Sequence, residues 1–313
     1  MTALVVESPG LLTTVQDLGR PGFGPMGVSA SGAADPVSLR LGNLLVGNEP
    51  GTAGLEMTLV GGSFVFPQGG VIAITGANFE AAINGCPAQT WTTHTIRRGG
   101  KLTFGASRDF ARSYLTIAGG IQVPLVLGSA STHLLSGLGG YEGRALRKGD
   151  VVRIGKVKRK APLKKIAESV LSNLQPNTVI RLTDGPQSGF FGEAVKQVFF
   201  RSTCRVAEES DRTGLRLEGP KIECDLSGEM ITEGVPLGAI QVTPSGQAII
   251  LFVEQQTTGG YPKIANVIGA DLHRLGQLRP RMDIRFERTS LAVARALWIE
   301  QERLLNSREQ LFA

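Results

Sequence analysis

The sequence contains few cysteine and histidine residues, which limits the chemistry available to it. Three cysteines occur, at positions 86, 204 and 224, and their wide spacing without a Cys-x-x-Cys motif argues against a disulfide framework and a zinc site. The three histidines, at positions 94, 133 and 273, have no neighbours at the spacing of a metal ligand set or a catalytic triad. We therefore expect no metal site and a reducing, cytoplasmic compartment.

Long hydrophobic runs are also missing. No apolar stretch approaches the ~18 residues of a membrane-spanning helix, so we expect no membrane association. The first ten residues have no basic region and include Glu7, which argues against a signal peptide. A Gly-x-Ser-x-Gly motif, the signature of one large class of serine hydrolases, does not occur either.

Excess positive charge is confined to one short segment. The net charge is +6, and six basic residues lie between positions 156 and 165. Outside that segment, basic and acidic residues are equal in number. No aromatic residue interrupts the basic run, as a surface that stacks single-stranded nucleic acid would require. We interpret the run as a solvated linker and expect no nucleic-acid partner.

Short β-rich runs bounded by glycine dominate the chain, and its 41 glycines favour many tight turns. These runs cover residues 3–7, 63–66, 71–75, 101–104, 112–118 and 151–154, then 179–183, 238–242, 248–253 and 283–286. Helical spacing of apolar residues predicts a helix over 35–46, with Asp35 as N-cap, and an amphipathic helix over 291–305. We predict an N-terminal β domain (1–156), a basic linker (157–176) and a C-terminal β domain that includes the terminal helix (177–313).

One segment imitates a phosphate-binding loop. Between Gly149 and Gly155 it has five residues where a phosphate loop has four, and Val157 stands where serine or threonine would bind magnesium. The intervening residues alternate as they do in a strand. We therefore predict a strand there and no nucleotide site.

Several polar loops flanked by glycine are the candidates for ligand binding. The richest covers residues 255–262, whose two amides, two hydroxyls and one phenol exceed the donors and acceptors that a turn needs. Backbone at glycine can approach a small polar ligand closely, and these donors suit a carboxylate or carbonyl oxygen. For the other loops, a turn or a helix cap explains the same residues, and both interpretations stay open.

The loops occur in an order that resembles the biotin-dependent carboxyltransferase-like family, which includes the C subunit of 5-oxoprolinase, the KipA regulator and the matching part of urea carboxylase. The resemblance extends from about residue 5 to residue 305. It rests on these segments: Thr-Val-Gln-Asp-Leu-Gly-Arg (14–20), Ser-Gly-Ala-Ala-Asp (31–35), Asn-Leu-Leu-Val-Gly-Asn (43–48), Ala-Gly-Gly-Ile (118–121), Leu-Gly-Ser-Ala-Ser-Thr (127–132), Gly-Tyr-Glu-Gly-Arg (140–144), Ser-Asp-Arg (210–212), Arg-Leu-Glu-Gly (216–219), Gly-Ala-Ile-Gln (238–241) and Gln-Thr-Thr-Gly-Gly-Tyr-Pro (256–262).

The resemblance implies a mainly β fold with two cyclophilin-like, β-barrel-like domains. It implies the C subunit of an ATP-dependent 5-oxoprolinase, which hydrolyses the 5-oxoproline lactam to glutamate together with a KipI-like B subunit and a third component, the A subunit. ATP would act in the complex at an unknown site, and the chain has no Met-Lys-Met motif for covalent biotin. Two alternatives stay open: a KipA-like protein that binds a KipI-like kinase inhibitor, and a carboxyltransferase component for urea or a related small amide, with biotin on a partner. Assembly into a homo-oligomer is also left open.

The resemblance also suggests the site residues. We expect Asp211, Arg212, Thr257 and Thr258 to act in catalysis, and Gln16, Asp17, Arg20, Ser31, Asp35, Asn78, Gln241, Gln256, Gly259, Gly260 and Tyr261 to bind substrate. Asp211 is suited to orient water, and Arg20 or Arg212 to bind a substrate carboxylate. Three places depart from the family pattern: Ala34, the Glu254-Gln255 pair, and Arg281, which replaces a turn glycine.

Overall fold

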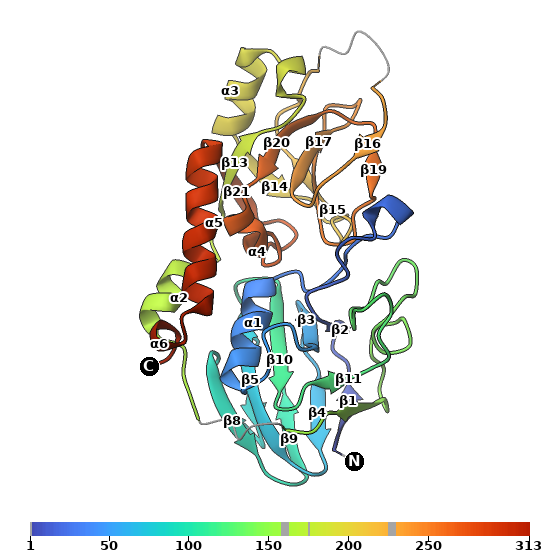
Figure 1. Cartoon of the computed structure of the whole chain (residues 1–313), viewed down its shortest axis with the longest axis vertical. Helices are drawn as coiled ribbons and strands as arrows, with labels where there is room; N and C mark the ends of the chain where they lie inside the picture. Colours follow the sequence, from blue (N-terminus) through green and yellow to red (C-terminus); the bar gives the residue numbers. More distant parts are fainter. Residues whose placement is uncertain (1, 158–162, 175, 225–229) are drawn as a thin grey trace. The chain divides into compact units, whose positions relative to one another are not determined.

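The computed structural model describes residues 2–157, 163–174, 176–224 and 230–313, which form two compact units (Figure 1). Unit 1 comprises residues 1–20, 31–175 and 304–313, and unit 2 comprises residues 21–30 and 176–303. Both are mainly β, as predicted. The units differ from the predicted domains at three places, because residues 21–30 group with unit 2, while residues 304–313 and the predicted linker up to residue 175 group with unit 1.

Within its described residues, unit 1 forms two antiparallel sheets around one apolar core. The first sheet has the strand order β11 (Ile121–Gln122), β12 (Val151–Ile154), β1 (Ala3–Ser8), β4 (Ser63–Phe66), β9 (Gly100–Thr103), β6 (Ala82–Ile83), β7 (Cys86–Pro87). The second has the order β2 (Leu12–Gln16), β3 (Gly54–Thr58), β10 (Arg112–Ile117), β5 (Gly70–Gly76), β8 (Thr92–Ile96). Phe64 and Leu102 of the first sheet and Leu55 and Ile74 of the second are fully buried in the shared core.

Helix α1 (Pro36–Leu45) packs on β5 and β10 of the second sheet (Figure 1). Asp35 caps this helix as predicted, since its carboxylate accepts a hydrogen bond from the Ser38 amide at 2.9 Å. Leu41 of the helix and Ala73 of β5 belong to a second apolar cluster. Ala73 alternates along β5 with core residues, so the helix covers the face of the sheet that points away from the first core.

The same cluster contains residues from the end of the chain and from the predicted linker. Val170 and Leu174 of α2 (Glu168–Leu174) are buried in it, together with Leu305 of α5 (Leu291–Asn306) and Leu311 of α6 (Arg308–Leu311). The predicted linker 157–176 is therefore partly a folded element of unit 1, because its helix has apolar residues that need burial. Positions 158–162 and 175 of that prediction lie outside the described residues.

The described strands of unit 2 include a closed barrel. Its order is β13 (Val179–Asp184), β20 (Lys263–Val267), β17 (Ala239–Val242), β18 (Ala248–Leu251), β15 (Gly214–Glu218), β14 (Thr203–Val206), β21 (Asp283–Arg288). Leu215, Ile240 and Ile250 are cross-strand neighbours and are buried. Because side chains alternate along a strand, the residues between them face the outside of the barrel.

Smaller elements complete unit 2. A two-stranded sheet pairs β16 (Glu233–Gly234) with β19 (Thr258–Gly259). The helices among its described residues are α3 (Glu193–Arg201), α4 (Leu272–Leu275) and α5 up to residue 303, and the short 3-10 turns are η1 (Gly24–Met26), η2 (Ser188–Phe190) and η3 (Gly269–Asp271). Within the described part of the chain, no helix has both the length and the apolar character needed to cross a membrane.

Candidate functional site

In unit 1, the carboxylate of Asp17 organises the loop formed by residues 129–132. Four donors from the chain bind it: the Ser129 and Ser131 hydroxyls at 2.6 and 2.5 Å and the Gly19 amide at 2.7 Å from Oδ1, and the Ala130 amide at 2.6 Å from Oδ2. Hydrogen bonds to an ionised acceptor are the strong ones, so this carboxylate stabilises the loop. A contact between Asp17 and substrate stays a prediction.

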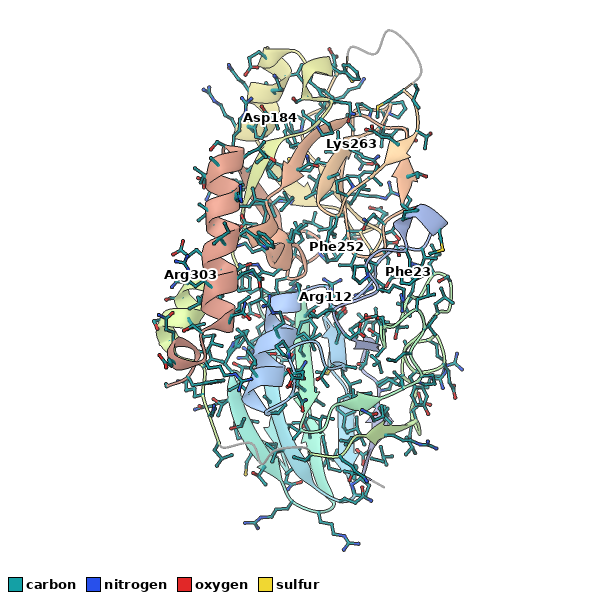
Figure 2. The ribbon with its side chains drawn as sticks, viewed as in Figure 1. Phe23, Arg112, Asp184, Phe252, Lys263 and Arg303 are labelled. Carbon is teal, nitrogen blue, oxygen red and sulfur yellow. The ribbon has the colours of Figure 1, made fainter. Side chains whose placement is uncertain are left out.

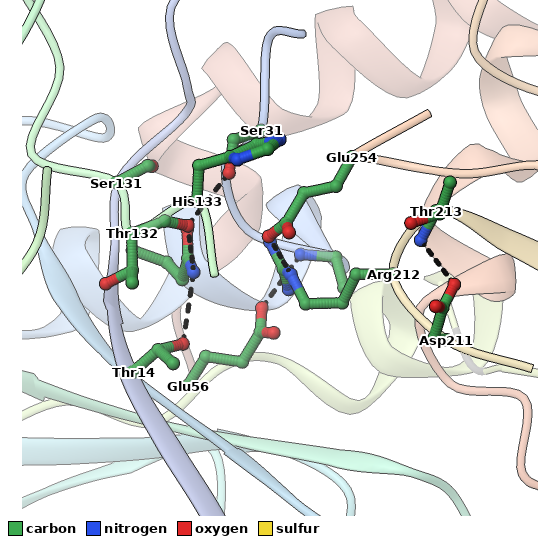
Figure 3. A network of polar contacts seen from close by, with 12 residues as sticks. Thr14, Ser31, Glu56, Ser131, Thr132, His133, Asp211, Arg212, Thr213 and Glu254 are labelled. Carbon is green, nitrogen blue, oxygen red and sulfur yellow. Dashed lines mark hydrogen bonds and ion pairs between the residues drawn. The ribbon is translucent and has the colours of Figure 1, made fainter. Parts of the chain in front are cut away.

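Three other predicted residues reach the same loop. Arg20, which is 1% exposed, donates from Nη2 to the Ser131 carbonyl. The Thr132 carbonyl accepts from the Ser31 hydroxyl at 2.9 Å (Figure 3). It also accepts from Gln16 Nε2 at 3.1 Å. The Oε1 atom of Gln16 is buried and has no hydrogen-bond partner among the described residues. The structure thus brings together Gln16, Arg20 and Ser31 around this loop. The Gln16 Oε1 is the acceptor in this group that has no donor among the described residues.

Two predicted residues of unit 1 make local bonds. Asp35 is the cap of α1 described above, and Asn78 is exposed and accepts a hydrogen bond from the Glu80 amide at 2.9 Å. Short side chains of this kind commonly satisfy the backbone of caps and turns. The cap and turn interpretation therefore accounts for both sets of contacts, and substrate binding by either residue stays a prediction.

Glu56 on β3 is a buried acid that sequence reasoning missed. Its Oε2 accepts from the Tyr114 hydroxyl at 2.7 Å and from the Ala34 amide at 2.8 Å, and its Oε1 lies 3.4 Å from Arg112 Nε. Burial, and next the Glu56 carboxylate, raise the pKa of Tyr114 well above its usual range, so the hydroxyl stays protonated and donates a hydrogen bond to Glu56. An isolated acid in an otherwise apolar strand is the signal that could have revealed it.

In unit 2, Arg212 and Glu254 form a buried ion pair. The Arg212 Nε lies 2.5 Å from the Glu254 Oε1, and the two side chains are 7% and 3% exposed (Figure 3). The backbone reinforces the pair, since the Glu254 amide donates to the Arg212 carbonyl at 2.8 Å. Arg212 therefore already holds a carboxylate of its own unit, and its catalytic role stays a prediction.

Asp211 shapes the entry to β15. Its Oδ1 accepts from the Thr213 amide at 2.7 Å and from the Gly214 amide at 3.1 Å, the pattern of a turn closed by an aspartate. Both bonds use one oxygen of an exposed carboxylate. No group of three His, Cys, Asp or Glu side chains suited to a metal ion occurs within the residues that the structure describes.

A pocket of about 320 Å³ lies on the outer face of the barrel over β15, β17 and β18. It is lined by Asp211, Thr213, Gly214, Arg216, Gln241, Thr243, Ile249, Leu251, Gln256 and Tyr261. Four of these were expected in the site, namely Asp211, Gln241, Gln256 and Tyr261. Thr257 and Thr258 do not line it. Arg216 was missed, although its place among alternating residues of a strand predicts a polar, outward side chain.

Gln241 is a buried polar residue among those that line this pocket. Gln241 is 2% exposed, and its Oε1 accepts a long hydrogen bond of 3.4 Å from Gln256 Nε2. Its Nε2 is buried without a partner among the described residues. A methyl group added at Gly259 would lie 2.7 Å from that atom and 3.1 Å from Gln256 Nε2, so glycine leaves room for both amides.

A buried lysine fastens the small β16–β19 sheet to the barrel. Lys263, which begins β20 (Figure 2), is 1% exposed. Its Nζ lies 2.5 Å from the Glu233 Oε1 on β16. Gln187 Nε2 donates to the same oxygen at 2.7 Å. The bonds from Lys263 and, next, from Gln187 lower the pKa of the Glu233 carboxyl. Since Glu233 pairs with Gly259 of β19, this contact also holds the segment that carries Gln256 and Tyr261.

Residues 26–288 match the model of the carboxyltransferase domain, subdomains A and B. The chain belongs to this family. This chain is 40% identical to the 5-oxoprolinase C subunit of Escherichia coli (strain K12) over 300 residues, which cover 96% of each chain. It is 36% identical to the 5-oxoprolinase C subunit of Haemophilus influenzae over 286 residues, or 91% of this chain and 90% of the relative. The predicted resemblance is confirmed.

A solved structure in the same family shares the fold. This chain superimposes on the urea amidolyase of K. lactis with a TM-score of 0.91 and 32% sequence identity. The match covers 99% of this chain but 20% of the urea amidolyase chain. The chain therefore corresponds to about a fifth of that protein.

Proposed function

We propose that this chain is the C subunit of a 5-oxoprolinase, an enzyme complex that opens the lactam of 5-oxoproline to glutamate in a reaction coupled to ATP. The proposal is carried by the 40% identity to the E. coli C subunit, which extends over 96% of both chains. The letter in that name points to an assembly of several subunits. We assign the other positions to a KipI-like B subunit and a third component, the A subunit.

The chemistry explains why the reaction requires ATP. A lactam is a stable amide, so its carbonyl must be activated before water attacks, and ATP can activate the carbonyl oxygen. The segment 149–156, which imitates a phosphate loop, contains strand β12. This segment is therefore not the proposed nucleotide site, and ATP would act at another, unknown site of the complex, with the small amide substrate on this chain.

The unit 2 pocket is the part of this chain that supports substrate binding. It combines a buried amide, an exposed guanidinium, a carboxylate and a phenol in about 320 Å³. That volume is at the lower end of the roughly 300–1,000 Å³ of small-molecule sites. The donors and acceptors suit a small polar molecule with a carbonyl group.

A reconstituted complex tests the proposal. The chain is purified together with its KipI-like partner and the third component, and glutamate release from 5-oxoproline is measured with and without ATP. We expect release only when all three proteins and ATP are present, and three mixtures that each omit one protein serve as controls. Absence of glutamate from the complete mixture would contradict the proposal.

Carboxyl transfer to urea or a related amide is the second candidate, supported by the TM-score of 0.91 to the K. lactis urea amidolyase. It requires biotin on a partner. The same preparation, supplied with urea, bicarbonate, ATP, a biotinylated carrier protein and a biotin carboxylase that carboxylates this carrier, would then transfer labelled carboxyl groups to urea. Glutamate release that does not depend on biotin decides for the first candidate, while a stable complex that performs neither reaction favours the KipA-like regulatory alternative.

A further inference from the structure

The unit 2 pocket has polar groups at the positions that one small ligand would need. We infer that it binds a lactam acid, with the Arg216 guanidinium holding the carboxylate and the Gln241 amide donating to the lactam oxygen. This inference rests on the proposed function, since 5-oxoproline carries both groups. Arg216 becomes the residue that selects for the carboxylate.

Three neighbouring barrel strands place these groups in one row. Gln241 on β17 pairs with Ile249 on β18, and Ile249 pairs with Arg216 on β15. Directly paired residues point to the same side of a sheet, and adjacent strands lie about 4.8 Å apart. The backbones of Arg216 and Gln241 are thus separated by two strand spacings, or about 10 Å, with the apolar Ile249 between them.

This order matches the shape of a lactam acid. The ring of 5-oxoproline carries a carboxylate on one side of its nitrogen and a carbonyl on the other, with methylene groups between them. Along the row, Arg216 would meet the carboxylate, Ile249 the methylene groups and Gln241 the carbonyl. Ile249 can contact the ring while Arg216 and Gln241 reach its two polar ends.

The donor at the Gln241 end lacks a partner within the protein. Its Nε2 is buried with no hydrogen-bond acceptor among the described residues, and a buried polar group without a partner is unfavourable. A lactam carbonyl oxygen would satisfy it. Gly259 leaves room for this amide, because a side chain there would meet Nε2 at 2.7 Å.

At the other end of the row, the Arg216 guanidinium is available to a ligand because it has no carboxylate partner among the described residues. Arg216 is exposed, and no carboxylate in the described part of the chain forms an ion pair with it. Guanidinium and carboxylate groups form paired, charge-assisted hydrogen bonds. Asp211, on the loop before β15, lines the same pocket and can accept from the lactam N–H.

Kinetics of the reconstituted complex test both ends of the ligand. We expect Arg216→Met and Gln241→Glu each to raise the KM for 5-oxoproline about 10- to 100-fold, with a smaller change in kcat, because each variant removes one binding contact. Arg205→Met is the matched control. Arg205 lies on β14, bonds Asp283 at 2.7 Å and does not line the pocket, so its KM should not change. Equal KM values for Arg216→Met and Arg205→Met would overturn the assignment.

A ligand without the carboxylate separates selectivity from loss of folding. 2-Pyrrolidinone keeps the lactam, so Arg216→Met should leave its inhibition constant unchanged, while Gln241→Glu should weaken it. A parallel loss of 2-pyrrolidinone binding in Arg216→Met would contradict the role of Arg216. Thermal unfolding of each variant shows whether the fold is retained.

Direct binding distinguishes the failure of this inference from the failure of the proposed function. Calorimetry measures 5-oxoproline binding to the complete assembly and to the isolated chain. Binding that depends on Arg216, without glutamate release, keeps the pocket and removes the hydrolase proposal. Glutamate release that is insensitive to both pocket variants keeps the hydrolase and removes the pocket, and absence of both activities removes both.

Discussion

The polar centres of the two units differ in how completely the chain satisfies them. In unit 1, the Asp17 carboxylate accepts four hydrogen bonds from its own chain, through hydroxyls and amides. In unit 2, Gln241 is 2% exposed, yet its Nε2 has no partner among the described residues. A saturated centre contributes to stability, whereas an open one can bind a ligand. Gln16 in unit 1, with its open Oε1, is an exception to this contrast.

The largest expected loss of stability comes from the buried Arg212–Glu254 pair, a polar centre of unit 2 in which the charges are paired. Comparing it with other polar groups of unit 2 keeps the fold constant. Glu254→Ala removes the carboxylate that pairs with buried Arg212, and loss of one partner of a buried pair costs about 3–5 kcal/mol. Urea denaturation measures this loss. The control is Asp283→Ala, which breaks the exposed pair with Arg205 and should not shift the midpoint. Equal midpoints for the two variants would show that burial does not decide the contribution of these pairs.

The next effect concerns the saturated centre of unit 1. Asp17→Asn places an amide among donors and leaves several of them unsatisfied, which we expect to lower the free energy of unfolding by about 2–4 kcal/mol. Chemical denaturation and the hydrogen-exchange protection of the Ala130 amide measure the change. Gln241→Leu, at the open centre, should cost less than about 1 kcal/mol, because no strong bond is lost. A larger loss from Gln241→Leu would break the comparison.

A smaller effect, on function only, is expected at the open centre. Gly259→Ala would place a methyl group 2.7 Å from Gln241 Nε2, so the two glutamine amides must shift. We expect the KM for 5-oxoproline to rise about tenfold, equivalent to ~1.4 kcal/mol. Gly234→Ala on the paired strand is the matched control, because its nearest atom lies at 4.0 Å. Indistinguishable kinetics for the two alanine variants would exclude a role for the space at Gly259.

The smallest effect is a pH dependence of the β16–β19 sheet. The pKa of Glu233 is lowered in the folded state, so its stabilising contribution is complete above the ordinary glutamate pKa and is lost as the pH falls through the lowered value. Protection of the Gly259 amide should fall over that acidic range. Lys263→Met removes the main cause of the shift and should abolish this dependence. Persistence of the same acid transition in Lys263→Met would assign it to another group.

Local patterns in the sequence predicted much of the secondary structure. The cap at Asp35, the strand at 151–154 in place of a phosphate loop, and the terminal helix are all present. Arg281, noted as a replacement for a turn glycine, has a φ of +66°, the conformation that glycine adopts most easily. These features depend on neighbouring residues only, so alternation, helical spacing and capping chemistry are sufficient to predict them.

Pairing between distant strands was beyond these local patterns. Strands β14, β15 and β20 were not predicted from local patterns. Because Arg216 lies on β15, the row of Gln241, Ile249 and Arg216 could not be recognised. The helix at 168–174 was hidden in the predicted linker, because its burial depends on residues near the end of the chain. Register and core membership arise from contacts across the fold, and no local period encodes them.

The loop at 255–262 illustrates this division. By itself the sequence determined that this segment is rich in donors and that the chain belongs with the carboxyltransferase family, because residue identity and order carry that information. Only the tertiary structure decided that Gln256 and Tyr261 line a pocket, while Thr257 and Thr258 do not. It also placed Arg216 beside them. The physical reason is strand register, which determines the side chains that share one face of the barrel.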